Sequence, residues 1–407
     1  MDAASLDAAD PLAHLRDRFV GAETDLVYFD GNSLGRPLRR SGESLAGFVA
    51  GAWGSRLIRG WDEEWFDLPL TLGDEIGRVA LGAAPGQVAV GDSTTVLLYK
   101  AMRAAVAARP GRTEIVLHRD EFPTDRYVAD GVARECGLTV RWIDTDPAAG
   151  VTPDQVAEAV GEQTALVSLS HVAYRSAWLA DAEAVTRVVH DAGALMLWDL
   201  SHAGGSVPVE LDAWGVDLAV GCTYKYLNGG PGSPAYVYLA TRHHEALTQP
   251  VQGWMGSTDP FVMGPAYAPV AGVRRFLSGT PPVLAMVPLR DMVAMLAEVG
   301  IDAVRQKSVA LTSYAVALAD EQLAPLGVEV ASPRDPARRG GHVTLAHPAM
   351  AQVVAALWRR DVIPDYREPG GLRVGLSPLS TSFAEVHRGI AAVREELERQ
   401  ASAARGS

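Results

Sequence analysis

Between about Gly51 and Thr280 the sequence alternates short apolar, β-branched runs with longer stretches of helical periodicity. This alternation is typical of a parallel sheet whose strands are joined by crossover helices. It predicts strands at 114–118, 138–143, 165–170, 194–199, 218–221 and 235–239, and helices at 93–108, 125–136, 154–160 and 181–192. We therefore expect an α/β domain over this part of the chain.

A proline-rich stretch, Gly279-Thr280-Pro281-Pro282, interrupts the alternation. A mostly helical segment over 284–323 follows, and then a shorter mixed segment that runs to the end. We expect a large domain at 46–284, a smaller C-terminal α/β domain at 285–407, and an N-terminal segment, 1–45, that is associated with the smaller domain.

Composition and charge restrict the partners. The net charge is −13, with the charges scattered along the chain, which argues against a surface for nucleic acid or for a membrane. No apolar run approaches the roughly 20 residues that span a bilayer, and the acidic start from Met1 to Asp10 lacks the pattern of a signal peptide. We expect a cytoplasmic protein that acts on small molecules and binds neither nucleic acid nor membrane.

Two residue types are scarce. Cys136 and Cys222 are the only cysteines and have no C-x-x-C spacing, so we expect neither a disulfide framework nor a metal site. Lysine occurs only at Lys100, Lys225 and Lys307. Any chemistry that needs a lysine therefore has three candidates.

Lys225 has the most distinctive surroundings of the three. It lies between Tyr224 and Tyr226, after an apolar strand and before the glycine-rich turn Gly229-Gly230-Pro231-Gly232. A lysine in an apolar setting can form a Schiff base with an aldehyde and can carry a proton. The alternative is a solvated surface lysine, which fits this setting less well.

Asp199 and His202 follow the strand expected at 194–199. The carboxyl ends of parallel strands are where open α/β sheets bind ligands. A buried carboxylate there can hold a protonated pyridine nitrogen and make the ring an electron sink. Taken alone, the two residues fit a turn cap and an ordinary loop histidine equally well.

Two further elements complete a pattern. Thr94 and Thr95 stand at the start of a helix, where hydroxyls and free N–H groups bind phosphate, although N-capping is an equally simple explanation. Phe122 follows a strand and can stack on a flat ring or pack in the core. Together with Asp199 and Lys225, these residues follow one another along the chain in the same order as in enzymes of the aminotransferase fold that bind pyridoxal 5'-phosphate (PLP). This order indicates a PLP site.

The sequence also resembles kynureninase, the PLP enzyme that hydrolyses kynurenine, over almost the whole chain. The string C-T-Y-K-Y-L-N-G-G at 222–230 and the start G-N-S-L-G at 31–35 are the most distinctive matches. Others are Leu57 to Trp61, Phe122 to Asp125, Ser170 to Val172, Asp199 to His202, Gly253 to Gly256, Ser278 to Pro282 and Leu372 to Val374. The resemblance implies the PLP-dependent transferase fold of type I, with a mixed, mostly parallel sheet flanked by helices and a smaller C-terminal α/β domain.

The resemblance also implies roles for single residues. Lys225 carries PLP as a Schiff base, Asp199 pairs with the ring nitrogen, and Tyr224 serves the phosphate and proton transfer. The remaining cofactor contacts are Thr94 and Thr95 at the phosphate, Phe122 on the ring face, Asp125 and Ser170 at the ring edge, and His202 at the ring substituents.

Further implied roles concern the substrate and a second subunit. Trp254 and Thr280 reach the phosphate or substrate from the neighbouring subunit, so the expected unit is a homodimer with shared active sites. Arg373 grips the α-carboxylate of the substrate with its planar fork of donors. Trp61 with the pair Gly279-Thr280 shapes an apolar slot for the aryl group, and the alternative for Trp61 is simply core packing.

The implied reaction is hydrolysis of L-kynurenine, or of a ring-substituted kynurenine, at the Cβ–Cγ bond to an anthranilate and L-alanine. Two departures from the family pattern, Ser257 in place of histidine and Ala173 in place of asparagine, leave the substitution of the aryl ring open. An aminotransferase on the same fold remains an alternative, and a non-catalytic PLP-binding regulator is a remote one. A cysteine desulfurase is disfavoured, because no cysteine follows Cys222 to supply its thiolate.

Overall fold

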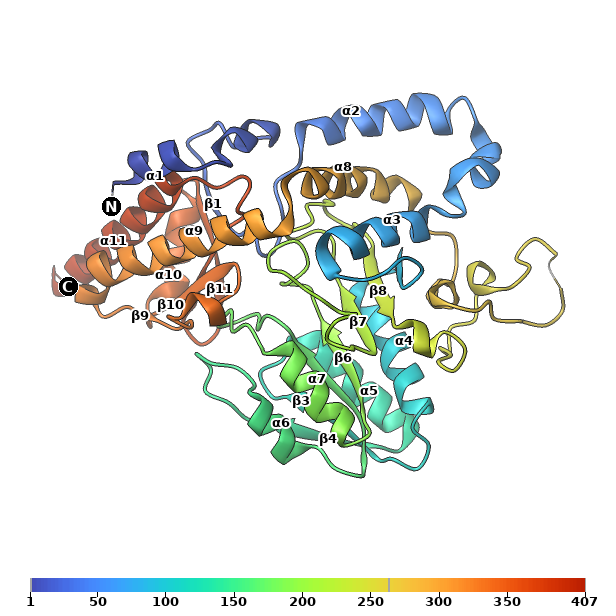
Figure 1. The fold of residues 1–407 in the computed structure, drawn as a ribbon. Helices are drawn as coiled ribbons and strands as arrows, with labels where there is room; N and C mark the ends of the chain where they lie inside the picture. Colours follow the sequence, from blue (N-terminus) through green and yellow to red (C-terminus); the bar gives the residue numbers. More distant parts are fainter. Residues whose placement is uncertain (1, 263, 407) are drawn as a thin grey trace.

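The chain folds around two β-sheets in the computed structural model, which describes residues 2–262 and 264–406 (Figure 1). The larger sheet has seven strands in the order β2-β8-β7-β6-β5-β3-β4. Its strands from β7 to β4 are parallel, whereas β8 runs antiparallel to both β7 and β2. The bounds are β2 Val88–Gly91, β3 Glu114–His118, β4 Thr139–Ile143, β5 Thr164–Ser170, β6 Leu195–Asp199, β7 Leu218–Gly221 and β8 Ala235–Leu239.

Crossover helices connect the parallel strands, as the sequence pattern predicts. They are α4 Thr94–Ala107, α5 Pro123–Cys136, α6 Pro153–Ala159 and α7 Ala182–Asp191. Three of them start at a side chain that accepts a backbone N–H: Ser93 caps α4, Thr152 forms a capping box with Gln155 on α6, and Asp181 caps α7. The expected fold class is confirmed, with strand and helix bounds within two residues of the prediction.

The smaller sheet has five strands in the order β1-β11-β12-β10-β9. Strand β1, Val27–Phe29, comes from the N-terminal segment and pairs in parallel with β11, Val362–Arg367. The others are β9 Glu329–Val330, β10 His342–Ala346 and β12 Gly371–Gly375, and their pairing is antiparallel. This pairing supports the proposal that segment 1–45 belongs with the C-terminal domain.

Long helices cover the smaller sheet and link it to the larger one (Figure 1). They are α8 Val283–Val299, α9 Ile301–Gln322, α10 Met350–Trp358 and α11 Phe383–Gly406. The N-terminal helix α1, Ala3–Ala9, lies beside α11, so both ends of the chain are on the same side. Helix α2, Arg39–Phe48, extends along α8, and α3, Leu68–Ile76, packs against β2.

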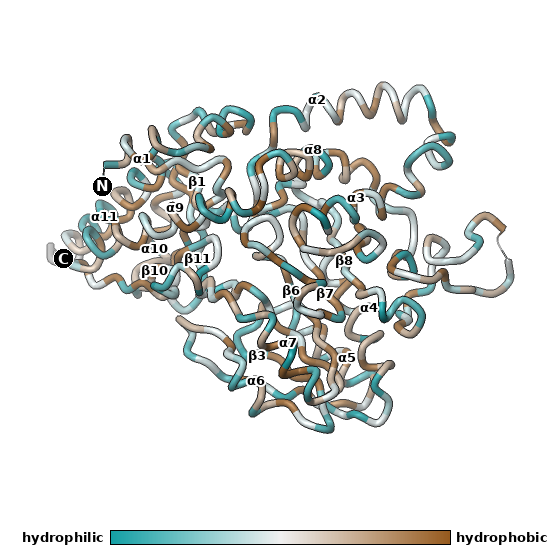
Figure 2. The backbone as a smooth tube through the Cα atoms, in the orientation of Figure 1, coloured by the Kyte–Doolittle hydropathy of each residue, from teal (hydrophilic) through white to brown (hydrophobic). Residues whose placement is uncertain are grey.

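The larger sheet is covered on both faces, so its inner strands are almost entirely buried, whereas the edge strand β4 exposes Thr139 and Arg141. All five residues of β6 are buried. Helices α4 and α5 pack on one face, while α3, α6, α7 and α8 contribute to the core on the other. Figure 2 shows the long hydrophobic stretches of such inner elements, among them α8. A fully covered parallel sheet leaves its carboxyl edge as the place where polar side chains gather.

Candidate active site

Polar side chains from several elements line a cavity of about 140 Å³ at the carboxyl edge of the larger sheet. Strand β5 ends there at Ser170 and β6 ends at Asp199. The lining residues are Thr94, Thr95, Phe122, Thr124, Asp125, Ser170, Tyr174, Asp199, Ser201, His202, Tyr224 and Lys225. The cavity therefore brings together nine of the residues predicted for the cofactor, all of them except Trp254 and Thr280.

Lys225 differs from the other two lysines in its contacts. Its Nζ lies in the cavity, 3.4 Å from Nε2 of His202, and it has no carboxylate partner among the described residues. Lys100 is fully buried with Nζ 2.5 Å from Oδ2 of Asp92 and 2.7 Å from the carbonyl of Phe276, and Lys307 pairs with Asp10. Of the three lysines, only Lys225 lines this cavity.

Aromatic rings surround the Lys225 amine. The Nζ atom lies 5.8 Å from the ring centre of Phe122 and 5.9 Å from that of Tyr224. Phe122 in turn meets Tyr174 edge to face, with ring centres 5.5 Å apart. Burial raises the pKa of the Tyr224 hydroxyl, and Cys222 raises it further. Tyr224 therefore keeps its proton at neutral pH.

Three buried carboxyl groups lie at or next to the cavity, those of Asp125, Asp199 and Glu121. Asp199 accepts a hydrogen bond from the Ser201 N–H at 2.7 Å through Oδ1. Burial raises the pKa of Asp125 well above its usual range, and the charges of Asp199 and Glu121 raise it further. Asp125 is thus held protonated beside Asp199. This arrangement attracts a cationic group such as a protonated ring nitrogen.

Two buried histidines lie behind Lys225. Burial lowers the pKa of His202 well below its usual range, and the charge of Lys225 and the nearby His342 lower it further, so His202 is neutral. The ring of His342 lies 5.7 Å from that of His202, and neither of its nitrogens has a hydrogen-bond partner in the described structure. His342 belongs to β10, so the smaller sheet supplies part of the wall behind the cavity.

The start of helix α4 faces the cavity through Thr94 and Thr95. Ser93 caps the helix by accepting a bond from the Val96 N–H at 3.4 Å. Asp92, just before the cap, has a left-handed backbone with φ of 46° and is held by Lys100. The first-turn N–H groups, which lack intrahelical partners, can receive an anion such as a phosphate.

Five residues predicted for the site do not line this cavity. Trp61 and Trp254 meet edge to face at 5.8 Å in an aromatic cluster that also contains Trp65, Phe66 and Phe261. Gly279 and Thr280 are exposed. Arg373 is buried just behind the cavity, where it donates to the Tyr174 carbonyl at 2.8 Å and pairs with Asp365.

The two departures from the family pattern lie in different places. Ala173 precedes Tyr174, which lines the cavity. Ser257 follows the short helix Trp254–Gly256 next to the aromatic cluster, and its N–H donates to the Trp254 carbonyl at 3.2 Å.

Some residues around the cavity were not predicted from the sequence. Thr124 and Ser201 lie inside the motifs Phe122 to Asp125 and Asp199 to His202, so those motifs already imply their position. Glu121 stands immediately before Phe122, and nothing in its local sequence distinguishes it from a surface residue. Tyr174 and His342 carry no local signal either, because tertiary packing brings them to the site.

Comparisons with known proteins point to one family. The family model for the kynureninase C-terminal domain matches residues 304–393. A kynureninase of Burkholderia pseudomallei is 41% identical, covering 98% of this chain and 96% of the relative. A kynureninase of Pseudomonas fluorescens is 39% identical, covering 98% of this chain and 95% of the relative.

Solved structures share the fold at low sequence identity. A cysteine desulfurase from Thermococcus onnurineus superposes with a TM-score of 0.81 at 17% identity, covering 95% of this chain and 98% of the other. The cystine C–S lyase C-DES, in complex with cysteine persulfide, gives 0.80 at 16% identity, covering 93% and 99%. The structures show the fold alone, whereas identity near 40% over nearly the full length shows that the chain belongs to the kynureninase family.

Proposed function

We propose that the protein hydrolyses L-kynurenine, or a ring-substituted kynurenine, at the Cβ–Cγ bond with PLP as cofactor. Water and the substrate yield an anthranilate and L-alanine, so the reaction balances without an oxidant or a metal. The observation that carries the proposal is the 41% identity to a kynureninase over 98% of the chain, combined with an amine, Lys225, that faces a cavity.

The residues of the cavity fit PLP in four separate ways. Lys225 offers an amine to the aldehyde, and Asp199 beside protonated Asp125 offers a carboxylate to the ring nitrogen. The start of α4 suits the phosphate, and Phe122 suits a ring face. A structural relative, a variant of C-DES, carries glycine covalently linked to its PLP cofactor. When bound, PLP supplies an electron sink that stabilises negative charge next to the substrate amine.

Each step then needs a proton at a defined atom. The Lys225 amine, between Phe122 and Tyr224, takes the α-proton of the substrate. Water adds to the γ-ketone, and the Cβ–Cγ bond breaks with the aryl carboxylate as one product. Tyr224, whose hydroxyl keeps its proton because burial raises its pKa, donates to Cβ to complete alanine. We assign the α-carboxylate to Arg373, which donates to the carbonyl of the cavity residue Tyr174.

A homodimer with shared sites is part of the proposal. Large apolar side chains are exposed on the segments next to Trp61 and Trp254: Trp53, Leu57, Ile58, Phe261 and Val262 are 50 to 76% exposed. Apolar side chains gathered in this way are typical of a protein interface. We assign Trp254, Thr280, Trp61 and Gly279 to the site of the partner subunit, since in their own chain they lie outside the cavity.

The location of the protein in the cell is part of the proposal. None of the helices in the described ranges combines the length and apolar character needed to cross a bilayer. Both cysteines are free thiols, and Cys136 is exposed. Free thiols are usual in a reducing compartment, which supports a cytoplasmic location.

The test is a product assay. The protein loaded with PLP is incubated with kynurenine and with its 3-hydroxy, methyl and chloro derivatives, and anthranilates and alanine are quantified by chromatography. We expect equal amounts of both products from at least one substrate. Amino transfer to a keto acid without release of alanine points to an aminotransferase, and full cofactor binding without any product contradicts the proposed reaction.

A further inference from the structure

Glu121 is a buried carboxylate next to the cavity that the proposed reaction does not use. It lies in the turn between β3 and α5 and is 4% exposed. Both of its oxygens lie 3.0 Å from the backbone N of Ser170, and Oε2 lies 2.6 Å from the Ser170 hydroxyl oxygen. Ser170 lines the cavity at the end of β5, whereas Glu121 itself does not.

The contact fixes what Ser170 can offer to a ligand. A serine hydroxyl has one hydrogen and two lone pairs. While that hydrogen points to Glu121, only the lone pairs of Oγ face the cavity, and Ser170 acts as an acceptor. If Glu121 carries a proton instead, it can donate to Oγ, and the hydroxyl hydrogen of Ser170 becomes free to donate into the cavity.

We propose that Glu121 is a positioning residue that switches Ser170 between hydrogen-bond acceptor and donor. It thereby sets the hydrogen bond that Ser170 makes to the phenolic oxygen of the cofactor. This inference rests on the proposed PLP site, in which Ser170 contacts the edge of the ring. The phenolic oxygen on a pyridine ring that is protonated at nitrogen carries negative charge and needs a hydrogen-bond donor. Protonated Glu121 therefore favours binding, and anionic Glu121 disfavours it.

Charged groups surround Glu121 on several elements. Asp199 lies at the end of β6 and Asp125 in the first turn of α5, and Asp120 is paired with Arg175 at 2.9 Å. Lys225 is a cation on the cavity side, where its charge acts on Asp125. Burial raises the pKa of Glu121 to about 7 against the opposing bonds from Ser170, with Asp199 and Asp120 adding to the rise. Both states of Glu121 are therefore populated near neutral pH.

The variant Glu121→Gln isolates the switch. Its amide donates to Ser170 Oγ while its carbonyl accepts the Ser170 N–H, which reproduces the protonated state at every pH. The probe is pyridoxine 5'-phosphate, which lacks the aldehyde, so Lys225 forms no bond to it. Dissociation constants are measured by tryptophan fluorescence between about pH 5.5 and pH 8.5. From about pH 6 to pH 8 the wild type should lose roughly 3- to 10-fold more affinity than Glu121→Gln, the effect of one hydrogen bond.

Ser170→Ala provides the matched control, since it removes the hydroxyl that is switched. In the Ser170→Ala background, Glu121 and its glutamine substitution should give the same pH profile. A profile of Glu121→Gln that equals the wild type, or a difference that persists without the hydroxyl, overturns the inference while leaving the proposed reaction intact. Absence of probe binding to the wild type at every pH overturns the cofactor site as well.

A second measurement does not involve the ligand. Folding raises the pKa of Glu121, so its protonated carboxyl group contributes to the stability of the folded state. This contribution is complete below the ordinary pKa of glutamate and is lost as the pH rises through about 7. The melting temperature of the apoprotein should therefore rise in Glu121→Gln relative to wild type at about pH 8, and less at about pH 5.5. An equal change at both pH values contradicts the titration of Glu121.

Discussion

The guanidinium of Arg373 lies against the carboxylate of Asp365 inside the protein, with Nε 2.8 Å from Oδ2. The Arg373 side chain is 1% exposed and that of Asp365 16%. The same guanidinium donates to the Tyr174 carbonyl at 2.8 Å and to the Ser33 hydroxyl at 3.1 Å. Asp365 thus holds the arginine proposed for the substrate carboxylate in place behind the cavity.

Neutralising Asp365 should destabilise the protein strongly. Asp365→Asn leaves the charge of Arg373 buried without its counter-ion, and we expect the free energy of unfolding in urea to fall by about 3 to 5 kcal/mol. The control is Glu395→Gln, which breaks the exposed pair with Arg360 and should cost less than about 1 kcal/mol. Equal effects of the two variants contradict the assigned role of Asp365.

Chemical trapping tests the choice of lysine. Borohydride reduction of the PLP-loaded protein, followed by peptide mapping, should label Lys225 and neither Lys100 nor Lys307. The reason is structural, because Lys100 is held by Asp92 and the Phe276 carbonyl and Lys307 by Asp10. Lys225→Ala should abolish labelling and turnover. A label on either of the other lysines would show that the cavity assignment is wrong.

Asp199→Asn tests the role of the carboxylate at the end of β6. Asparagine can still accept the Ser201 N–H bond, so the turn should keep its geometry. Without the charge the ring nitrogen is no longer held protonated, and we expect kcat to fall by about 100- to 1000-fold, the range for one preorganised electrostatic contact. Retention of PLP, measured after gel filtration, separates this effect from loss of the cofactor. Near-normal kcat would exclude the role.

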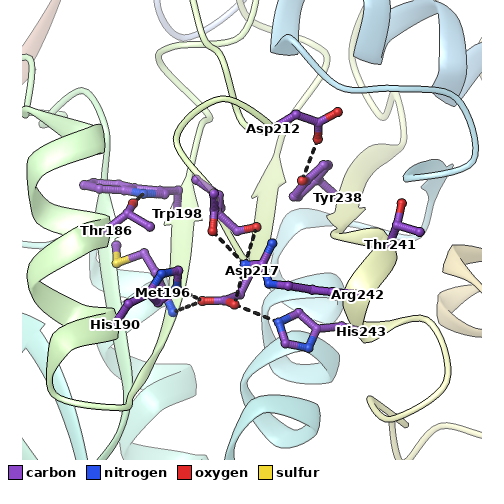
Figure 3. Close-up of polar contacts among 12 residues, drawn as sticks. Thr186, His190, Met196, Trp198, Asp212, Asp217, Tyr238, Thr241, Arg242 and His243 are labelled. Carbon is purple, nitrogen blue, oxygen red and sulfur yellow. Dashed lines mark hydrogen bonds and ion pairs between the residues drawn. The ribbon is translucent and has the colours of Figure 1, made fainter.

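An ion-pair network at the opposite end of the larger sheet supports the fold (Figure 3). Buried Asp217 accepts from the Met196 N–H at 2.8 Å, contacts His190 and His243 at 2.7 Å each, and pairs with Arg242 at 2.6 Å. Burial alone raises the pKa of Asp217, but the bonds from His190, His243 and Met196 outweigh it and hold the pKa below its usual range.

Asp217→Asn should therefore destabilise the protein in a pH-dependent way. We expect a loss of about 3 kcal/mol at neutral pH, because a buried charge with several donors is replaced by an amide. Since the folded pKa of Asp217 is depressed, its contribution is full above the ordinary value and disappears as pH falls below about 4. Urea unfolding should show wild type and variant converging in acid. A pH-independent difference contradicts the assignment.

Local sequence determined most of the large sheet because its strands and crossover helices have clear patterns and caps. The strands at 114–118, 218–221 and 235–239 have the predicted bounds. Strand β2, Val88–Gly91, was missed because four apolar residues carry no distinguishing period, and its position depends on pairing with β8. The edge strand β1 was also missed, because it depends on pairing with β11, which lies more than 300 residues further along the chain.

The residues of the site likewise fall into those that the sequence predicts and those that it does not. Residues at strand ends and helix starts, such as Asp199 and Thr94, could be predicted because backbone topology alone places them at one edge. The partner of Arg373, the hydrogen bonds of Glu121 to Ser170, and the approach of His342 to His202 could not. Glu121 and Ser170, like His342 and His202, lie on segments that are distant in sequence, so only tertiary packing brings them together. Asp365 and Arg373 are close in sequence, but only the pairing of β11 with β12 places them opposite each other.

Mixing two inactive variants tests the shared active site. Lys225→Ala removes the amine of one site, and Trp254→Ala removes an aromatic ring that lies outside the cavity of its own chain. If Trp254 serves the partner, a mixed dimer has one site with both residues intact. Co-expression in equal amounts should then restore about one quarter of wild-type activity, because half of the dimers are mixed and each has one complete site of two. The control is Lys225→Ala mixed with Asp199→Ala. Because both defects lie in the same cavity, this pair leaves no complete site in any dimer. Recovery with the first pair but not the second supports shared sites, whereas no recovery with either pair places Trp254 in its own subunit's site or in the fold alone.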